Sequence, residues 1–336
     1  MRNVGLIGAG NISDTHARAA EAAGLNVVAV YGDNRDKARH LAARHNAIAY
    51  TDLEAMLGHA DLELVMIGSP SGLHAAQAAA AVRRGLHVLV EKPLDITTER
   101  IDALLEEVER AGVTLGVFFQ DRLKPDVLKL KDALASGAIG TPVLATGEVK
   151  WSRPASYYAS SRWRGTWALD GGGALMNQGI HTVDLLLYLL GPVVRVSGAI
   201  ATRVHRIEAE DTALATIEFA TGVVATITAT TAAGEGRPRR VEIIGSRGAL
   251  VFEGDALVDP NAPSRPTTAP ENASSPVVSD VSAHQRIVED FVDAVTNNRP
   301  PVCDGRQGRQ SVAVVEAVYR SAREKTAIDL RMIADR

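Results

Sequence analysis

Cysteine is almost absent from this sequence, because Cys303 is the single one among 336 residues. One thiol excludes an internal disulfide and a cysteine cluster for a metal, and we expect no metal site. Aromatic residues make up only 4% of the chain, and no apolar run approaches the ~20 residues that span a bilayer. The 36 basic and 40 acidic residues leave a net charge of −4 without a basic stripe, so neither a membrane nor a nucleic acid is an expected partner.

The length and the first residues narrow the class of protein further. A chain of 336 residues exceeds one typical core, so two domains are expected. The opening MRNVGLIGAG enters a strand at once, without the regions of a signal peptide, and this predicts a cytoplasmic protein.

A glycine-rich loop follows the first expected strand, Val4–Ile7. It has the dinucleotide pattern G-x-G-x-x-G, with serine at the third glycine position. Gly8 permits the tight turn, and Gly10 lets a pyrophosphate approach the backbone. The amides of Asn11 and Ile12, which open the next helix, then face the anion. The loop predicts a nucleotide-binding Rossmann unit.

A second strand, Asn26–Tyr31, leads to an acidic residue, Asp33. A carboxylate at this position accepts hydrogen bonds from the adenosine ribose and repels a 2′-phosphate, so Asp33 favours NAD over NADP. If Gly32 occupies the ribose position instead, NADP stays open. Helical and extended patterns then alternate, which predicts a doubly wound parallel sheet. The alternating segments are Arg35–His45, Ala47–Tyr50, Leu53–Leu57, Leu62–Ile67, Leu73–Arg84 and His87–Val90.

Polar residues follow two of these strands, where an open parallel sheet binds its ligands. Ser69, Pro70 and His74 come after one strand, and Glu91 and Lys92 after the other. A lysine that ends an apolar strand is badly placed as a solubilising charge. We therefore expect Lys92 to point at the nicotinamide end of a cofactor.

The segment Asp170–Leu190 carries the next polar group. Its three consecutive glycines, 171 to 173, allow close approach of another group to the backbone. The apolar run that follows has helical period, and Asn177, His181 and Asp184 share one face of that helix. The alternatives are a helix across an active-site floor, or a satisfied core histidine with Asn177 as a cap.

The pattern changes after the sixth strand, Val113–Phe119, and we place the domain boundary at residue 121. Gln120 is either a contact to the cofactor or domain seam, or a turn residue. A helix, Pro125–Ala135, precedes an open and mostly antiparallel sheet. The expected strands are Pro142–Trp151, Val193–Val204, Ala213–Phe219, Val223–Thr231, Arg239–Ile244 and Ala249–Phe252.

Few helices remain to cover the second face of this sheet, which predicts a homodimer or homotetramer. Residues 122–336 would thus form an α+β domain for substrate binding and oligomerisation. Asp255–Ser279 is expected to be a long loop, followed by helices at His284–Thr296 and Gln310–Glu324, and the helix at 310–324 is expected to pack back on the first domain.

Aromatic and arginine residues are concentrated between residues 151 and 167. Aromatic rings stack on sugars, and guanidinium groups bind hydroxyls or anions. Candidate substrate-binding residues in this segment are Arg153, Tyr157, Trp163 and Arg164. Subunit packing is the alternative, since interfaces favour the same residue types.

Taken together, Gly8-x-Gly10, Ser69-Pro70 with His74, Glu91-Lys92-Pro93 and Gly179-x-His181-x-x-Asp184 resemble the Gfo/Idh/MocA family of NAD(P)-dependent oxidoreductases. The resemblance implies hydride transfer between NAD(P) and a secondary hydroxyl of a sugar, cyclitol or related polyol. It implies that Lys92 binds the reacting oxygen and that His181 donates or accepts the proton.

One position departs from the family pattern, because Asn177 stands where several members have an aspartate. An amide orients a hydroxyl but supplies no charge to an imidazolium, so the division of protons between His181 and Lys92 stays open. Two other functions remain as alternatives: glycoside hydrolysis through a transient oxidation by NAD, and non-catalytic nucleotide sensing.

Overall fold

The computed structural model describes residues 2–261 and 280–330, which divide into two compact units. The first unit comprises Met1–Gln120 and Ser275–Arg309, and the second comprises Asp121–Ser274 and Gln310–Arg336. The break after Gln120 lies one residue before the boundary expected from the sequence. The first unit also takes in a segment, Ser275–Arg309, that the sequence analysis assigned to the second domain.

A parallel sheet of six strands forms the centre of the first unit, in the order β3-β2-β1-β4-β5-β6. Its strands are near-continuous apolar runs, as expected for strands covered on both faces, and Leu6, Met66 and Leu89 are at most 1% exposed. The strands are β1 (Asn3–Ile7), β2 (Asn26–Tyr31), β3 (Ile48–Tyr50), β4 (Leu64–Ile67), β5 (His87–Val90) and β6 (Leu115–Val117).

The helices of the first unit connect these strands, and Thr97 caps the longest connection by accepting a hydrogen bond from the amide of Arg100. They are α1 (Asn11–Ala22), α2 (Arg35–Arg44), α3 (Leu53–Leu57), η1 (Ser71–Leu73), α4 (His74–Val82) and α5 (Thr98–Ala111). A later helix, α9 (Ser282–Thr296), packs against α1. The predicted Rossmann architecture is confirmed, although the sequence analysis did not identify α5.

A mixed sheet of eight strands forms the centre of the second unit, in the order β13-β12-β11-β7-β10-β9-β8-β14. Only the pair β7–β10 is parallel, which confirms the mostly antiparallel sheet. The strands are β7 (Pro142–Lys150), β8 (Val193–Ala201), β9 (Thr212–Phe219), β10 (Val224–Thr230), β11 (Arg240–Gly245), β12 (Gly248–Glu253), β13 (Ala256–Val258) and β14 (Ile328–Asp329).

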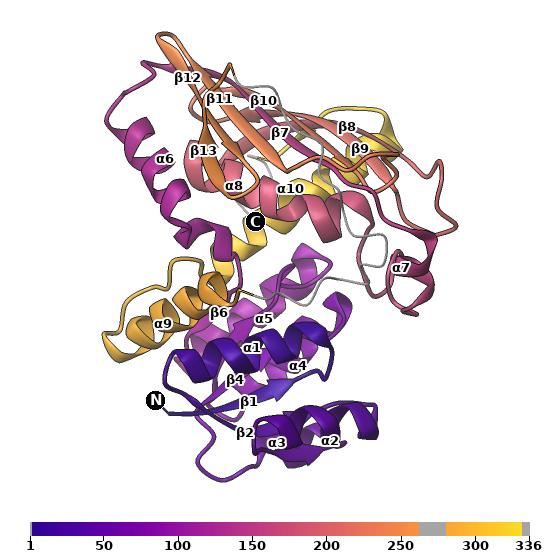
Figure 1. Ribbon diagram of the computed structural model, residues 1–336, viewed down its shortest axis with the longest axis vertical. Helices are drawn as coiled ribbons and strands as arrows, with labels where there is room; N and C mark the ends of the chain where they lie inside the picture. Colours follow the sequence, from indigo (N-terminus) through magenta and orange to yellow (C-terminus); the bar gives the residue numbers. More distant parts are fainter. Residues whose placement is uncertain (1, 262–279, 331–336) are drawn as a thin grey trace. The chain divides into compact units, whose positions relative to one another are not determined.

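Helices cover one face of this second sheet (Figure 1). These covering helices are α6 (Pro125–Ala135), η3 (Ala174–Gly179), α8 (Ile180–Leu190) and α10 (Gly305–Glu324), which begins in the first unit. The unit also contains η2 (Gln120–Leu123), which begins one residue before it, and the short α7 (Ala155–Ala159). Gly147 on β7 lies against α8, where a Cβ would stand 2.7 Å from Thr182, and Gly198 on β8 lies against Val318 of α10. Among described residues, no helix lies over the opposite face in Figure 1, as the sequence predicts.

Two expectations for the C-terminal third need comment. The strand β13, Ala256–Val258, occupies the start of the segment predicted to be a loop, and residues 262–279 of that loop lie outside the described residues. The first residues of α10 belong to the first unit, where a Cβ at Gly308 would stand 2.7 Å from Val117, whereas the predicted helical segment 310–324 falls in the second unit. Its later residues, including Val318 and Tyr319, pack within the second unit.

Candidate active site

The cofactor candidates lie at one edge of the parallel sheet. Gly8 follows β1, and its φ of +112° and the 2.8 Å between an added Cβ and the carbonyl of Gly68 both require glycine. Gly10 has open space where a Cβ would stand, as a close-lying pyrophosphate needs. Gly10 is the N-cap of α1, so the amides of Asn11 and Ile12 are in the first helical turn, which has no carbonyl partners.

Gly32 and Asp33 follow β2, and Asp33 is the one whose side chain can reach a ribose. Gly32 is buried, and an added Cβ would lie 2.9 Å from that of Ala9, so no side chain fits there. Asp33 is exposed, and its Oδ1 accepts a hydrogen bond of 2.8 Å from the amide of Asn34. Its second oxygen is suited to a ribose hydroxyl, and the cradle as a whole fits a dinucleotide without a 2′-phosphate.

Glu91 and Lys92 follow β5, in a cluster of buried polar groups. Glu91 is 7% exposed, and its Oε1 lies 3.1 Å from Nε2 of His16 and 3.9 Å from Nε2 of His284. Burial opposes ionisation of Glu91, but the His16 hydrogen bond and the charges of His16, Lys92 and His284 outweigh it and lower its pKa to about 2. The Oε2 atom of Glu91 also accepts from the amide of Lys92 at 3.1 Å, which ties the lysine backbone to a charged, buried anchor.

His74 braces two of these loops from inside. It is 1% exposed, with Nδ1 2.7 Å from the carbonyl of Pro93 and Nε2 2.9 Å from that of Ser69. Burial lowers the pKa of His74, against the smaller effect of its two carbonyl partners. The neutral ring donates to one carbonyl at a time, so His74 supports the loops after β4 and β5 from below.

The other three strand-end candidates are only partly buried. Ser69 and Pro70 are half-buried, and the Ser69 hydroxyl donates to Oε1 of Gln77 at 2.6 Å. Gln120, in η2 after β6, has a buried Oε1 that no described donor contacts.

In the second unit, the glycines before η3 make room for the protein's own side chains. A Cβ on Gly173 would stand 1.8 Å from the carbonyl oxygen of Glu210, and one on Gly172 would stand 2.1 Å from the Tyr319 hydroxyl. The Glu210 carboxylate accepts from the amides of Gly173 at 2.9 Å and Leu175 at 2.8 Å, and from the Tyr319 hydroxyl at 2.8 Å. These contacts fix the start of η3, which has π-helical rather than α-helical geometry.

Only three residues between Ala174 and Leu187 are not buried, namely Asn177, Gln178 and His181. All three are polar, and the side chain of His181 is 16% exposed. These three residues form a polar window in the otherwise buried η3 and α8. His181 is therefore partly exposed and is not a fully buried core histidine.

A hydrogen-bonded chain links this polar window to the aromatic segment. Nδ2 of Asn177 donates to Oδ1 of Asp170 at 2.5 Å, and Nε2 of Gln178 donates to Oδ1 of Asn177 at 2.8 Å. The same Gln178 nitrogen lies 2.9 Å from the hydroxyl of Tyr157 on α7. The predicted substrate residues Asn177 and Tyr157 thus belong to one network.

A carboxylate from outside its helix lies beside His181. Oδ2 of Asp121 lies 3.9 Å from Nδ1 of His181 and also contacts the guanidinium of Arg239, while Oδ1 of Asp121 lies 2.5 Å from Nζ of Lys124. Burial opposes ionisation of Asp121, but Arg239, His181 and Lys124 hold its pKa far below the usual range. Asp121 therefore stays a carboxylate beside the imidazole.

Asp184, which shares the helix with His181, has a separate role. It is 1% exposed, and its carboxylate accepts two hydrogen bonds from Arg122, at 2.9 and 2.6 Å. The hydroxyl of Ser311 on α10 adds a third, at 3.0 Å. Asp184 is thus part of an internal ion pair that anchors α8 to η2 and α10.

The aromatic and arginine candidates form a cluster around Tyr157. The Cζ atoms of Arg153 and Arg164 lie 5.1 and 4.4 Å from the centre of its ring. Arg153 also contacts the ring of Trp151 at 5.1 Å, and Arg164 that of Trp163 at 5.5 Å. All four predicted substrate residues of this segment therefore lie together.

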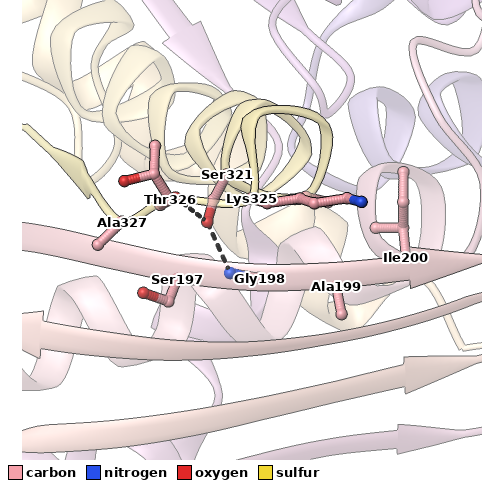
Figure 2. Close-up of a pocket in the computed structure, with 9 residues that line it drawn as sticks. Ser197, Gly198, Ala199, Ile200, Ser321, Lys325, Thr326 and Ala327 are labelled. Carbon is pink, nitrogen blue, oxygen red and sulfur yellow. Dashed lines mark hydrogen bonds between the residues drawn. The ribbon is translucent and has the colours of Figure 1, made fainter.

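A hollow of about 400 Å³ lies between β8 and the end of α10, and none of the predicted site residues lines it (Figure 2). Its lining includes Ser197, Lys325 and Thr326. The Ser321 hydroxyl donates to the carbonyl of Thr326 and accepts from the amide of Gly198, so its hydrogen-bonding capacity is used internally. The hollow is unrelated to the predicted site.

Sequence comparisons agree with the geometry of both units. Residues 2–119 match an oxidoreductase family with an NAD-binding Rossmann fold, and residues 127–251 match the GFO/IDH/MocA C-terminal domain. The chain belongs to the Gfo/Idh/MocA oxidoreductase family. It is thus an NAD-dependent oxidoreductase, and the family resemblance inferred from the sequence motifs is confirmed.

Three relatives illustrate the range of this family. The WlbA dehydrogenase of Bordetella pertussis, solved with NADH and UDP-GlcNAcA, is 31% identical, with a TM-score of 0.88 over 98% of both chains. A levoglucosan dehydrogenase solved with NADH and levoglucosan is 25% identical, with a TM-score of 0.86 over 98% of this chain and 99% of the other. Inositol 2-dehydrogenase of Rhizobium meliloti is 27% identical over 97% of this chain and 98% of its own.

Several supporting residues carried no local sequence signal. Their partners are distant in the chain. Asp121 lies beside His181, which is 60 residues later, and Glu210 accepts from Tyr319, which is 109 residues later. Arg239 contacts Asp121. Asp170 is different, because it begins the segment Asp170–Leu190 that the sequence analysis identified. Its place beside the three glycines was the one sequence feature that could have indicated its role as a partner of Asn177. The described residues contain no helix with the length and apolarity to cross a membrane.

Proposed function

We propose that the protein is an NAD-dependent dehydrogenase acting on a secondary hydroxyl of a sugar, cyclitol or related polyol, or on the corresponding carbonyl. The observation that carries this proposal is the polar window of Asn177, Gln178 and His181 in a buried helix. The names of the relatives support the substrate class, since they include an inositol dehydrogenase and an anhydrosugar dehydrogenase.

The catalytic roles proposed here belong to Lys92, His181 and Asn177. The Lys92 ammonium would bind the reacting oxygen and stabilise the negative charge that develops on it. His181 would accept the hydroxyl proton, and Asn177, held by Asp170, would orient the hydroxyl. Bound NAD supplies the hydride acceptor.

The cofactor would be held by residues of the first unit. Gly8, Gly10, Asn11 and Ile12 would bind the pyrophosphate, and Asp33 the ribose. Further contacts would come from residues after β4, β5 and β6, namely Ser69, Pro70, Glu91, Lys92 and Gln120, with His74 as their support. We propose that this cofactor domain ends at residue 121.

We also propose a cytoplasmic location for the protein, because NAD is available there.

Substitution of the two catalytic candidates tests the mechanism. Lys92→Ala should lower turnover by orders of magnitude and leave NAD affinity within a few-fold, while the exposed Lys37→Ala should change neither. His181→Ala should remove or shift the alkaline limb of the pH–rate profile. Near-normal turnover in Lys92→Ala, or an unchanged profile in His181→Ala, would assign the chemistry elsewhere.

A screen of sugars, cyclitols and anhydrosugars with NAD and NADP tests the activity itself. The dehydrogenase should produce reduced cofactor in proportion to oxidised sugar. Release of an aglycone without net reduction would indicate a glycosidase instead. Cofactor binding with no turnover of any sugar would indicate a sensor.

The uncovered face of the second sheet is proposed to join two copies of the chain. Leu144, Leu214 and Val224 are 39%, 53% and 42% exposed, and Val224 lies beside Leu144 across β10 and β7. Apolar side chains gathered on an open face favour association. Light scattering should show a dimer or tetramer that Leu214→Lys with Val224→Lys disrupts, whereas Ile48→Lys, at an equally exposed site of the first unit, leaves it intact.

A further inference from the structure

Arg153 is an unusual arginine, because nothing described neutralises its charge. It is half-buried and packs between the rings of Trp151 and Tyr157, with Cζ 5.1 Å from both ring centres. Its Nε is buried and has no hydrogen-bond acceptor among the described residues. A buried donor without an acceptor is destabilising, so a ligand that brings an acceptor to this guanidinium is favoured.

The backbone holds Arg153 firmly in place. Its amide donates to the carbonyl of Thr231 at 2.9 Å, just beyond the end of β10. The neighbouring Ser152 forms an antiparallel bridge with Ala232. Because two aromatic rings and this backbone pairing fix its position, the guanidinium loses little freedom when it binds a ligand.

A second guanidinium shares the same ring. Cζ of Arg164 lies 4.4 Å from the centre of the Tyr157 ring, and its Nη1 donates to the carbonyl of Tyr157 at 3.2 Å and to the hydroxyl of Ser160 at 3.3 Å. Both guanidinium groups therefore lie beside one aromatic ring, in the segment that follows β7. Guanidinium forks match the planar geometry of carboxylate and the oxygens of phosphate.

The Tyr157 ring connects this pair of arginines to the proposed reacting residues. Its hydroxyl lies 2.9 Å from Nε2 of Gln178, which in turn donates to Asn177, four residues before His181. A substrate whose hydroxyl lies at Asn177 and His181 would thus extend toward Arg153 and Arg164.

We propose that Arg153 and Arg164, held by Tyr157, form an anion-binding arm, and that the substrate is an acidic sugar bearing a carboxylate or a phosphate. This inference rests on the proposed function, because it takes Asn177 and His181 as the reacting end. It goes beyond that function by requiring a negative charge on the substrate.

The test compares D-glucose with acidic counterparts, D-glucuronate, D-glucose 1-phosphate and UDP-glucose, by calorimetric titration of the NADH-saturated protein. We expect at least one acidic compound to bind about 10- to 100-fold more tightly than glucose, the range for hydrogen bonds to a charged group. Preference for glucuronate would identify a carboxylate, and preference for the phosphorylated compounds a phosphate.

Substitutions then assign that preference to the arm. Arg153→Gln should remove most of the preference for acidic sugars. Arg153→Lys should retain part of that preference, because lysine keeps the charge but lacks the guanidinium fork. The control Arg162→Gln, at an exposed arginine of the same segment, should retain all of it. In the unsubstituted protein, the preference for acidic sugars over glucose should also become smaller when the salt concentration is raised from about 0.05 M to about 0.5 M. Equal binding of glucose and its acidic counterparts, or a preference unchanged in Arg153→Gln, would overturn the inference.

The outcome is separable from that of the proposed function. Tight binding of an acidic sugar through Arg153 without any reduction of NAD would leave the anion-binding arm in place and refute the dehydrogenase. Oxidation of acidic sugars with a KM that is equal to that of neutral sugars and unchanged in Arg153→Gln would support the dehydrogenase and refute the arm.

Discussion

The carboxyl of Glu210 should make the stability of the second unit depend on pH. Glu210 is 1% exposed, and burial raises its pKa from 4.5 to about 7, against the hydrogen bonds from Leu175, Tyr319 and Gly173. The folded state therefore binds this proton more tightly than the unfolded state. The stabilisation is complete below the unfolded pKa of 4.5 and is lost as pH rises through about 7.

The size of the effect follows from that difference in pKa. A shift of ~2.5 units is worth ~3 kcal/mol, of which ~2.5 kcal/mol is lost between about pH 5 and about pH 8. Glu210→Gln has no carboxyl to titrate, so this part of the pH dependence should vanish in the variant. The free energy of unfolding of the natural protein, measured against the variant, should thus fall by ~2.5 kcal/mol over that interval.

Tryptophan fluorescence during denaturant unfolding measures this difference. All three tryptophans lie between residues 151 and 167, so the signal reports the second unit. Glu235→Gln, at an exposed glutamate, should follow the natural protein at both pH values. A difference that stays constant with pH, or that grows in favour of the natural protein at pH about 8, would show that the three hydrogen bonds keep Glu210 ionised.

Two further substitutions test the packing under the His181 helix. Gly173→Ala would place a Cβ 1.8 Å from the carbonyl oxygen of Glu210. Because that neighbour is backbone and cannot move aside, we expect a loss of ~3 kcal/mol in the free energy of unfolding. The control Gly234→Ala, in open space, should change it by less than ~0.5 kcal/mol. Arg122→Met would leave Asp184 buried and uncompensated, so a loss of ~3–5 kcal/mol is expected, with partial recovery in Arg122→Met/Asp184→Leu. Denaturation midpoints of these variants check both, and equal midpoints within either pair would contradict the packing described here.

Elements with strong local signals were predictable from the sequence. The strands Asn26–Tyr31 and His87–Val90 and the helix Pro125–Ala135 have the predicted ends. Each is a continuous apolar or amphipathic run bounded by turn residues or by proline, so the local pattern determines it.

Elements that depend on distant partners were missed. The strand β14 has two residues, and it pairs with β8, more than 120 residues earlier. The five-residue helix α7 is held by Tyr158, whose hydroxyl lies 2.7 Å from that of Thr231. Neither is long enough to be stable by its own propensity, which is why no window of the sequence indicates it.

The candidate site shows the same limit at the level of single residues. Helical spacing placed Asn177, His181 and Asp184 on one face, and it treated them as equivalent. The structure separates them, because Asp184 pairs with Arg122 inside the unit while His181 keeps access to solvent. A periodic pattern identifies a face of a helix, but the packing of each side chain on that face decides which one reaches solvent.

The same reasoning bears on the amide at position 177, which supplies no charge to His181. Negative charge reaches the imidazole from Asp121, 60 residues earlier, at 3.9 Å from Nδ1. Asp170 lies behind the amide and fixes its orientation through the 2.5 Å hydrogen bond, so a carboxylate at position 177 would face a second one there. The asparagine at position 177, where several family members have an aspartate, avoids that like-charge contact, and the ionised Asp121 lies beside the imidazole ring. An asparagine at position 177 is therefore compatible with a negative charge beside the histidine, because Asp121 supplies that charge from a different element.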